Sequence, residues 1–226
     1  MEKIKVKQQS KLMWYISIAA LTFVILAFGS LSMVDTDRLE RYLKPFVVIH
    51  ILSALGWLML FSYQSWLITK RRLEKHRSNL RLATILVVIT TIFSIVITYQ
   101  WGSAQRFVGE SRDVLCFAIL FFASIWAVNR GKQETHKRLM LMALLNLIVP
   151  ATTRVKFLFD LTDGFMLLIT VLIWILVPIL YDLVTLRKIH KATILGIVFT
   201  ILSFVLMIAT VMSPLMEDID AFLYAH

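Results

Sequence analysis

The hydrophobic positions of this chain fall into long runs that short polar stretches separate. A helix that crosses a membrane needs about 20 consecutive apolar residues, because it rises 1.5 Å per residue and must bridge about 30 Å of hydrocarbon. The pattern predicts an all-α integral membrane bundle of seven transmembrane helices in a single transmembrane domain, residues 1–226. The predicted spans are 12–34, 46–69, 82–101, 114–128, 139–153, 165–186 and 192–212.

Three of these runs need further interpretation. The lysine-rich start of the chain imitates a signal peptide, but the run 12–34 is longer than a signal-peptide core and no small-residue cleavage site ends it, so we interpret it as a retained span. The runs 114–128 and 139–153 are too short to cross a bilayer alone. We expect them to recruit flanking polar residues whose side chains can snorkel to the interface. These residues are Arg112, Asn129 and Arg154.

The distribution of charge predicts how the bundle is oriented. The chain is 59% hydrophobic and carries a net charge of +10, and 17 of its 24 Lys and Arg residues lie on one side of the predicted membrane. Basic residues mark the cytoplasmic side, so we expect the N-terminus inside and the C-terminus outside. The basic residues form no separate domain, which argues against a nucleic-acid partner. The expected partners are the lipid bilayer, anionic lipids at the basic cytoplasmic face and a membrane-protein partner.

A sequence repeat indicates that helical hairpins are the building unit. Glu74-x-His76-Arg77 recurs 60 residues later as Glu134-x-His136-Lys137, and His190-Lys191 is a fainter copy. Each copy follows a basic turn and opens a helix that runs from the inside to the outside. The pattern predicts parallel hairpins of spans two–three, four–five and six–seven, with the first span outside the repeat.

Four polar residues near the outer end form the main candidate binding site: His50, Asp113, Arg154 and Asp163. Polar groups in membrane spans are costly and often mark function. Such a cluster can bind a metal, a quinone head group or an anion. Alternatively, Asp113 and Asp163 cap helix N-termini and His50 fixes packing. In the binding hypothesis we expect Arg154 within salt-bridge reach of Asp113 or Asp163, with His50 facing the same cavity.

Three histidines at the inner end allow a second hypothesis. His76, His136 and His190 each begin an odd-numbered span, which invites a metal or haem site. However, Lys or Arg flanks each of them and would repel a bound cation. The alternative is a set of interfacial histidines in a basic, lipid-facing collar. The single cysteine, Cys116, lies in an apolar run and is expected to be a small buried residue.

The helix starts at His76 and His136 share the pattern H-[RK]-x-x-[LM], with His50 opening the preceding helix. Over about residues 46–191 the chain thereby resembles a group of uncharacterised bacterial multi-span membrane families. Some related four-span families are linked to maturation of respiratory oxidases. The resemblance implies a multi-pass protein of the bacterial inner membrane. Together with the lack of a catalytic set, it favours a non-enzymatic accessory or small-ligand-binding protein that serves a respiratory complex.

The chain is more remotely similar to the two-haem transmembrane cytochromes b. That similarity implies His76 and His136 as ligands of haem b, with His50 at a second haem, although Asp113 stands where the pattern needs His. It gives the alternative of a divergent haem- or quinone-binding membrane redox protein. A second alternative is a small transporter with its site at the outer polar cluster.

Overall fold

The computed structural model describes residues 2–34, 43–101 and 103–224, with side chains described except at 2–8, 31–34, 101, 157 and 158. Lys3, Lys5 and Lys7, on which the predicted orientation partly rests, therefore lie outside the described side chains. Every regular element in the described ranges is a helix. The helices are α1 (Glu2–Val34), α3 (Pro45–Thr69), α4 (Leu73–Ser78), α5 (Leu80–Trp101), α6 (Ala104–Asn129), α7 (Gln133–Leu147), α8 (Val149–Phe159), α9 (Asp163–Leu186), α10 (Lys191–Val211) and α11 (Leu215–Tyr224).

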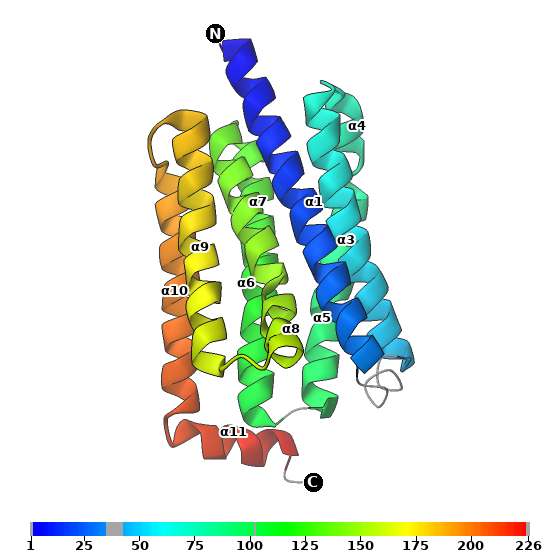
Figure 1. Cartoon of the computed structure of the whole chain (residues 1–226), viewed down its shortest axis with the longest axis vertical. Helices are drawn as coiled ribbons and strands as arrows, with labels where there is room; N and C mark the ends of the chain where they lie inside the picture. The colour runs from blue at the N-terminus through cyan, green and yellow to red at the C-terminus, as the bar shows by residue number, and fades with distance from the viewer. Residues whose placement is uncertain (1, 35–42, 102, 225–226) are drawn as a thin grey trace.

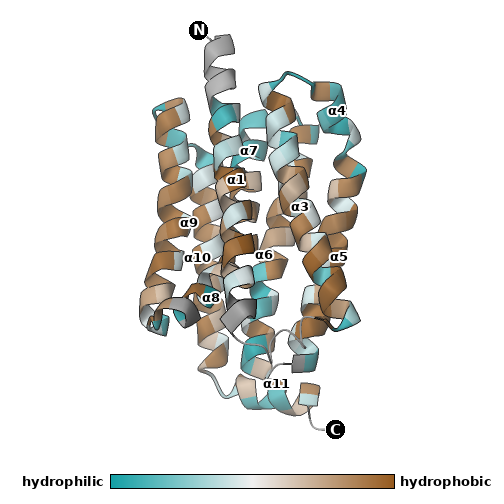
Figure 2. Cartoon of the chain, turned by 45° about the vertical axis from the view of Figure 1, so that its right-hand side comes forward, coloured by the Kyte–Doolittle hydropathy of each residue, from teal (hydrophilic) through white to brown (hydrophobic). Residues whose placement is uncertain are grey.

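Seven helical segments are long and apolar enough to cross a membrane, which confirms the predicted all-α fold at that level. They lie side by side, with the two ends of the chain at opposite ends of the bundle and α11 across the end near the C-terminus (Figure 1). Hydrophobic residues cover the middle of the long helices and hydrophilic residues gather at their ends (Figure 2). This is the hydropathy pattern that a bilayer imposes.

The fourth and fifth spans are longer than their apolar runs suggest. α6 has 26 residues and begins where the Ser103 hydroxyl accepts a hydrogen bond from the Arg106 N–H, 3.4 Å away. The fifth span joins α7 to α8 at a break beside Pro150, a residue that the first turn of α8 tolerates. The expectation that Arg112 snorkels to the interface is wrong, because Arg112 lies about 12 Å inside α6 and is only 8% exposed.

α6 and α7 form the centre of the bundle. Over half of the span windows of α6 and α7–α8 is buried, against 11% for α5 and α10, which present most of their surface outward. Trp57 of α3 packs edge-on against Phe117, with ring centroids 4.8 Å apart. Small residues bring helices close, as membrane packing requires. A Cβ on Gly196 of α10 would meet the Met142 side chain of α7 at 2.8 Å.

The turns after α3 and α6 share one backbone pattern. The Arg72 N–H donates to the Leu67 carbonyl at 2.9 Å, and the Lys132 N–H donates to the Ala127 carbonyl at 3.0 Å. The residue before each donor is left-handed: φ is 58° at Arg71 and 74° at Gly131. Both turns therefore reverse the chain in the same way, 60 residues apart.

Candidate functional site

The structure places His50 in a contact between two helices. Its Nδ1 lies 3.4 Å from the Thr90 carbonyl and 3.3 Å from the Ser94 hydroxyl, both on α5. The neighbouring Ser53 hydroxyl accepts a hydrogen bond from Thr90 at 2.9 Å. These contacts join α3 to α5. This is the packing role that the sequence analysis gave as the alternative to ligand binding by His50.

Arg154 lies near enough to His50 for its charge to act on the imidazole, but within the described residues the predicted ion pairs of this cluster do not form. Arg154 donates to the Pro150 carbonyl and the Thr153 hydroxyl, each at 3.1 Å. Asp163 is paired instead with Lys156 at 2.5 Å, and its side chain is 84% exposed. The expected ion pair of Arg154 with Asp113 or Asp163 is wrong for the described side chains.

The capping alternative for the two acids is also wrong. The N-cap of α6 is Ser103, and that of α9 is Thr162, whose hydroxyl accepts from the Phe165 N–H at 3.3 Å. Asp163 stands in the first turn of α9, where a carboxylate still interacts favourably with the helix dipole. Asp113 lies well inside α6 and pairs with Arg112.

The three inner histidines differ in their contacts: His136 joins α7 to α6, His190 caps α10, and the buried Nδ1 of His76 has no partner among the described atoms. The Nδ1 of His136 lies 3.1 Å from the Ser124 carbonyl, and the His76 carbonyl accepts from Gln64 at 3.0 Å. His190 is the N-cap of α10, since its Nδ1 accepts from the Ala192 N–H at 3.1 Å. Within the described residues, no group of three His, Cys, Asp or Glu side chains is placed to hold a metal. Asp113, which stands where the cytochrome b pattern needs a second outer histidine, pairs with Arg112.

The most unusual polar residue of the bundle is one that sequence reasoning missed as a site. The Arg112 guanidinium pairs with Asp113, and its Nη2 donates to the Thr200 carbonyl at 2.5 Å. Nη2 and Nε also donate to the Ser203 hydroxyl, at 2.9 and 3.2 Å. Arg112 thus reaches from α6 to α10 inside the span region, where an ionised residue is a functional candidate by default.

Aromatic rings form the other wall around this guanidinium. Its central carbon lies 4.7 Å from the ring centroid of Trp174 and 5.5 Å from that of Phe204. The two rings meet at 5.7 Å. A cation over an aromatic face is stabilised by about 0.5–2 kcal/mol, more when it is desolvated. α9 and α10 therefore hold the charge in place from a second side.

Two buried polar groups beside Arg112 have no hydrogen-bond partner among the described atoms. They are the Nε1 of Trp174, in the ring that faces the guanidinium, and the Oδ1 of Asn146. The amide nitrogen of Asn146 donates to the Thr200 hydroxyl at 3.3 Å, so Thr200 contacts both Asn146 and Arg112. We define the Arg112 cluster as Arg112, Asp113, Asn146, Trp174, Thr200 and Ser203. A buried group without a partner costs about 1–3 kcal/mol, so this cluster is incomplete as it stands.

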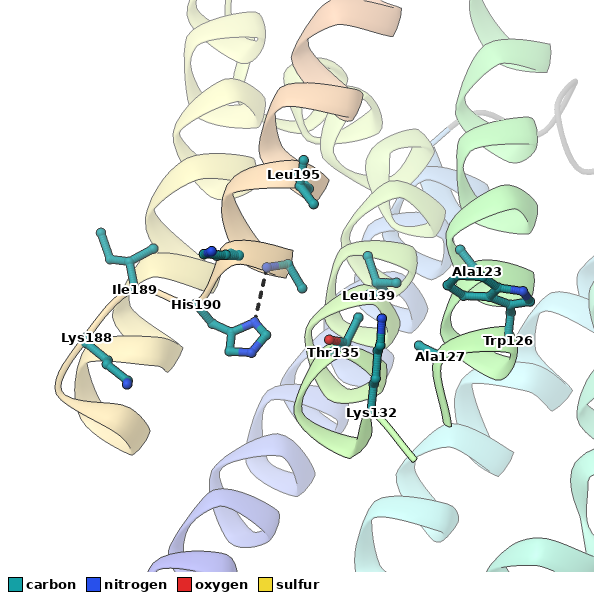
Figure 3. A pocket seen from close by; sticks show the side chains of 12 residues that line it. Ala123, Trp126, Ala127, Lys132, Thr135, Leu139, Lys188, Ile189, His190 and Leu195 are labelled. Carbon is teal, nitrogen blue, oxygen red and sulfur yellow. Dashed lines mark hydrogen bonds between the residues drawn. The ribbon is translucent and has the colours of Figure 1, made fainter. Parts of the chain in front are cut away.

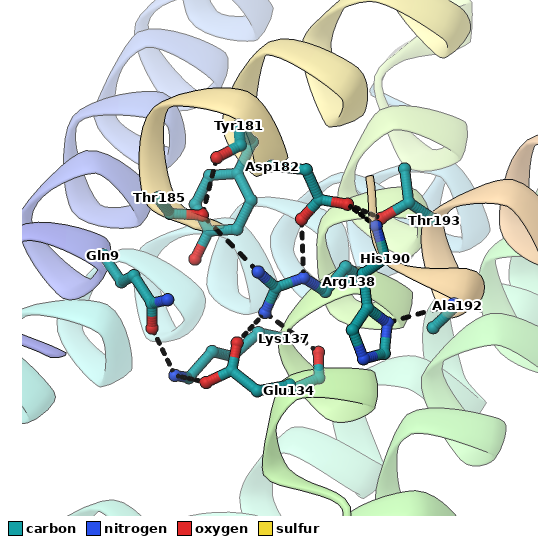
Figure 4. Close-up of polar contacts among 10 residues, drawn as sticks. All are labelled: Gln9, Glu134, Lys137, Arg138, Tyr181, Asp182, Thr185, His190, Ala192 and Thr193. Carbon is teal, nitrogen blue, oxygen red and sulfur yellow. Dashed lines mark hydrogen bonds and ion pairs between the residues drawn. The ribbon is translucent and has the colours of Figure 1, made fainter. Parts of the chain in front are cut away.

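A second buried arginine, Arg138, lies nearer the basic end and has hydrogen-bond and ion-pair partners around its guanidinium (Figure 4). Arg138 is fully buried; its Nε donates to Asp182 at 2.8 Å and its Nη1 pairs with Glu134. The other Asp182 oxygen accepts from the His190 N–H at 2.8 Å and from the Thr193 hydroxyl at 2.5 Å. We call Glu134, Arg138, Asp182 and Thr193 the Arg138 network. No described side chain of this network has a buried polar atom without a partner.

Comparison of the chain with protein-family models, curated proteins and solved structures finds no match. The class of protein is therefore defined by the fold and the cluster alone. It is a polytopic helical protein with seven potential membrane spans and an incomplete charged cluster buried among α6, α7, α9 and α10.

Proposed function

We propose that this chain is a non-enzymatic membrane protein that binds a small carboxylate-bearing ligand at the Arg112 cluster. One observation carries the proposal: the buried guanidinium lies against the Trp174 ring, whose N–H has no partner among the described atoms, and it shares Thr200 with Asn146, whose Oδ1 has none either. Arginine prefers carboxylate, and the Trp174 N–H supplies a further donor to the same group. A hydroxyl on the ligand would donate a hydrogen bond to the Oδ1 of Asn146, which lacks a partner among the described atoms. Small hydroxy-carboxylates are therefore the favoured ligand class.

Charge balance predicts how such a ligand enters. Arg112 and Asp113 already neutralise one another, so a bound carboxylate would leave one unbalanced negative charge in a dry site. Burying an unpaired charge is very costly. The ligand therefore enters with one proton, carried on the ligand or on Asp113, and binding strengthens as the pH falls. Calorimetry in buffers of different ionisation enthalpy measures this proton uptake directly.

The hydroxyl and thiol of this region support binding rather than catalysis. The Ser203 hydroxyl donates to the Thr200 carbonyl at 2.8 Å, and the Cys116 thiol donates to Ser203 at 3.3 Å. A nucleophile needs an adjacent base that accepts its proton. The acceptors here are a backbone carbonyl and a hydroxyl, and neither is such a base. An accessory role beside a respiratory complex rests on the resemblance of the His76 and His136 helix starts. Co-purification with an assembled oxidase tests it.

Calorimetry in lipid nanodiscs tests the ligand proposal with L-lactate as probe and acetate, which lacks the hydroxyl, as the matched comparison. We expect lactate to bind more tightly than acetate. Trp174→Phe should weaken lactate binding by about tenfold or more, because it removes one hydrogen bond to a charged group. Trp66→Phe, an aromatic change far from the cluster in the sequence and on α3, is the control. Equal lactate binding by both variants would contradict the proposal, and a Soret band in the purified protein would favour the haem alternative.

A proton-coupled transporter is the second candidate, and one observation favours it. The Asp113 side chain is 17% exposed whereas Arg112 beside it is 7% exposed, so the cluster touches the surface through its acid. Proton uptake with the ligand is also what a coupled carrier requires. Uptake of labelled lactate by proteoliposomes under an inward proton gradient distinguishes this candidate from a binding protein, which would show none.

We further propose that the basic ends face the cytoplasm of a bacterial cell and that the chain lies in its inner membrane. The excess of Lys and Arg on one side supports this orientation. The matching turns at Arg71 and Gly131 support the hairpin repeat. A reporter that is active only when exported, fused after His226, should be active. Activity of a cytoplasmic reporter at the same position would contradict the orientation.

A further inference from the structure

A groove opens on the flank of the bundle at its basic end, between α6, α7 and α10 (Figure 3). Its volume is about 660 Å³. Lysines and a histidine form one part of its lining and small or aliphatic residues form the other. We call it the basic groove and define it by Lys132, Lys188, His190 and Lys191 on the polar side and by Ala123, Leu139 and Leu195 on the apolar side.

The polar side of the basic groove is built for an anion. Its lining includes three lysines and no acidic residue. The nearby acids, Glu134 and Asp182, are already paired with Arg138. Because the His190 Nδ1 accepts the Ala192 N–H, the ring proton resides on Nε2, which leaves a donor at the groove. The N-terminus of the 21-residue α10 adds a favourable dipole.

The apolar side continues from the lysines into the membrane-spanning region. Ala123, on α6, lies more than one helical turn inside the basic turn that ends this helix. Leu195, on α10, is 67% exposed on the outside of the bundle. The basic groove is thus polar where the span ends and apolar where the bilayer begins.

We propose that the basic groove binds one anionic phospholipid. Its phosphate lies among Lys132, Lys188 and Lys191, and an acyl chain follows Ala123 and Leu195. A lipid fits this order of surfaces, because its charge and its hydrocarbon are arranged along the membrane normal in the same sequence. An acidic segment of a partner protein would match the lysines but not the apolar side. The inference is independent of the ligand proposed for the Arg112 cluster.

Native mass spectrometry tests this proposal on protein exchanged into equal amounts of phosphatidylglycerol and phosphatidylcholine. We expect one retained phosphatidylglycerol per chain, in at least tenfold excess over phosphatidylcholine. The triple variant Lys132→Gln, Lys188→Gln, Lys191→Gln should lose at least tenfold of this retained species. The control triple variant Lys75→Gln, Arg77→Gln, Arg81→Gln removes the same charge from another basic turn and should retain it.

Ala123→Phe tests the hydrocarbon contact without a change of charge. It fills the apolar side and should reduce retention several-fold, while the melting temperature reports whether the variant is folded. Equal losses in the two triple variants would overturn the proposal, because they would show general attraction to a basic surface. Equal retention of the two lipids would overturn it too. An unchanged Ala123→Phe protein, or retention of an acidic peptide in place of lipid, would do the same.

Discussion

Two arginines lie buried in the span region of this protein, and their surroundings differ. Arg138 is fully buried and joins α7 to α9, and every described polar group of its network has a partner. Arg112 is nearly as buried and joins α6 to α10, yet two neighbouring polar atoms remain without partners. Both are arginine beside a carboxylate. Burial of the charge is therefore common to both sites. They differ in the completeness of their hydrogen bonds, and on that difference we base the proposal of a ligand at Arg112.

The physical reason is the cost of an unpaired polar group in a medium without water. A network in which every polar atom has a partner gains no hydrogen bond from a ligand. Removing one of its members leaves a buried charge without its partner, which is destabilising. An incomplete cluster gains when a ligand supplies the missing partners. We therefore expect the Arg138 network to control stability and the Arg112 cluster to control binding.

The largest effect is expected from Asp182→Asn. The substitution leaves the fully buried Arg138 with no charge partner at Nε and should lower the free energy of unfolding by about 3–5 kcal/mol. Reversible denaturation in mixed micelles measures it. Asp163→Asn, in an exposed ion pair with Lys156, is the matched control and should cost about 0–1 kcal/mol. A similar small loss for both variants would remove the structural role that we assign to the network.

Arg112→Leu should have a smaller effect on stability, about 2 kcal/mol, and a larger one on binding. Asp113 is 17% exposed whereas Asp182 is fully buried, so Asp113 loses less when its partner is removed and it becomes protonated. Lactate binding should disappear in calorimetry. If Arg112→Leu unfolds the protein as severely as Asp182→Asn, the two sites are both structural and the distinction fails.

Thr193→Val removes one hydroxyl from the saturated network at nearly constant volume. The hydroxyl donates to Asp182 at 2.5 Å, and a hydrogen bond inside a membrane protein contributes about 0.6–1.7 kcal/mol. We expect a loss of about 1 kcal/mol in the same denaturation assay, with lactate affinity unchanged. A change in affinity would indicate that the two buried sites are coupled through α10.

Asn146→Leu is expected to change stability least, by less than about 0.5 kcal/mol. It removes two donated bonds but also the acceptor that has no partner, and these contributions oppose each other. Lactate affinity should fall while acetate affinity stays nearly constant, because only the hydroxyl loses its partner. Equal falls for lactate and acetate would place the ligand elsewhere in the cluster.

The sequence by itself determined the fold class of this protein. A bilayer requires long apolar helices, and each of the seven predicted runs lies in a helix that is long and apolar enough to span it. The hydropathy pattern was less informative at the ends of spans. An apolar run ends at the first charged residue, so the pattern puts that residue outside the span even when the helix continues past it. Arg112 was misplaced for that reason, although Ser103 as a helix N-cap nine residues earlier was a local signal that the helix begins before it.

Only the tertiary structure decided which polar residues meet. Arg112 and Thr200 are 88 positions apart and Arg138 and Asp182 are 44 apart, so no local spacing encodes either contact. Arg154 and Asp163 illustrate the converse. Similar depth in the sequence pattern predicted an ion pair between them, whereas Asp163 pairs with Lys156 and Arg154 bonds to Pro150 and Thr153 of its own helix. Hydropathy fixes how deep a residue lies because the membrane acts along one axis. Rotation of each helix about that axis is set by packing against its neighbours, and this rotation creates the buried cluster.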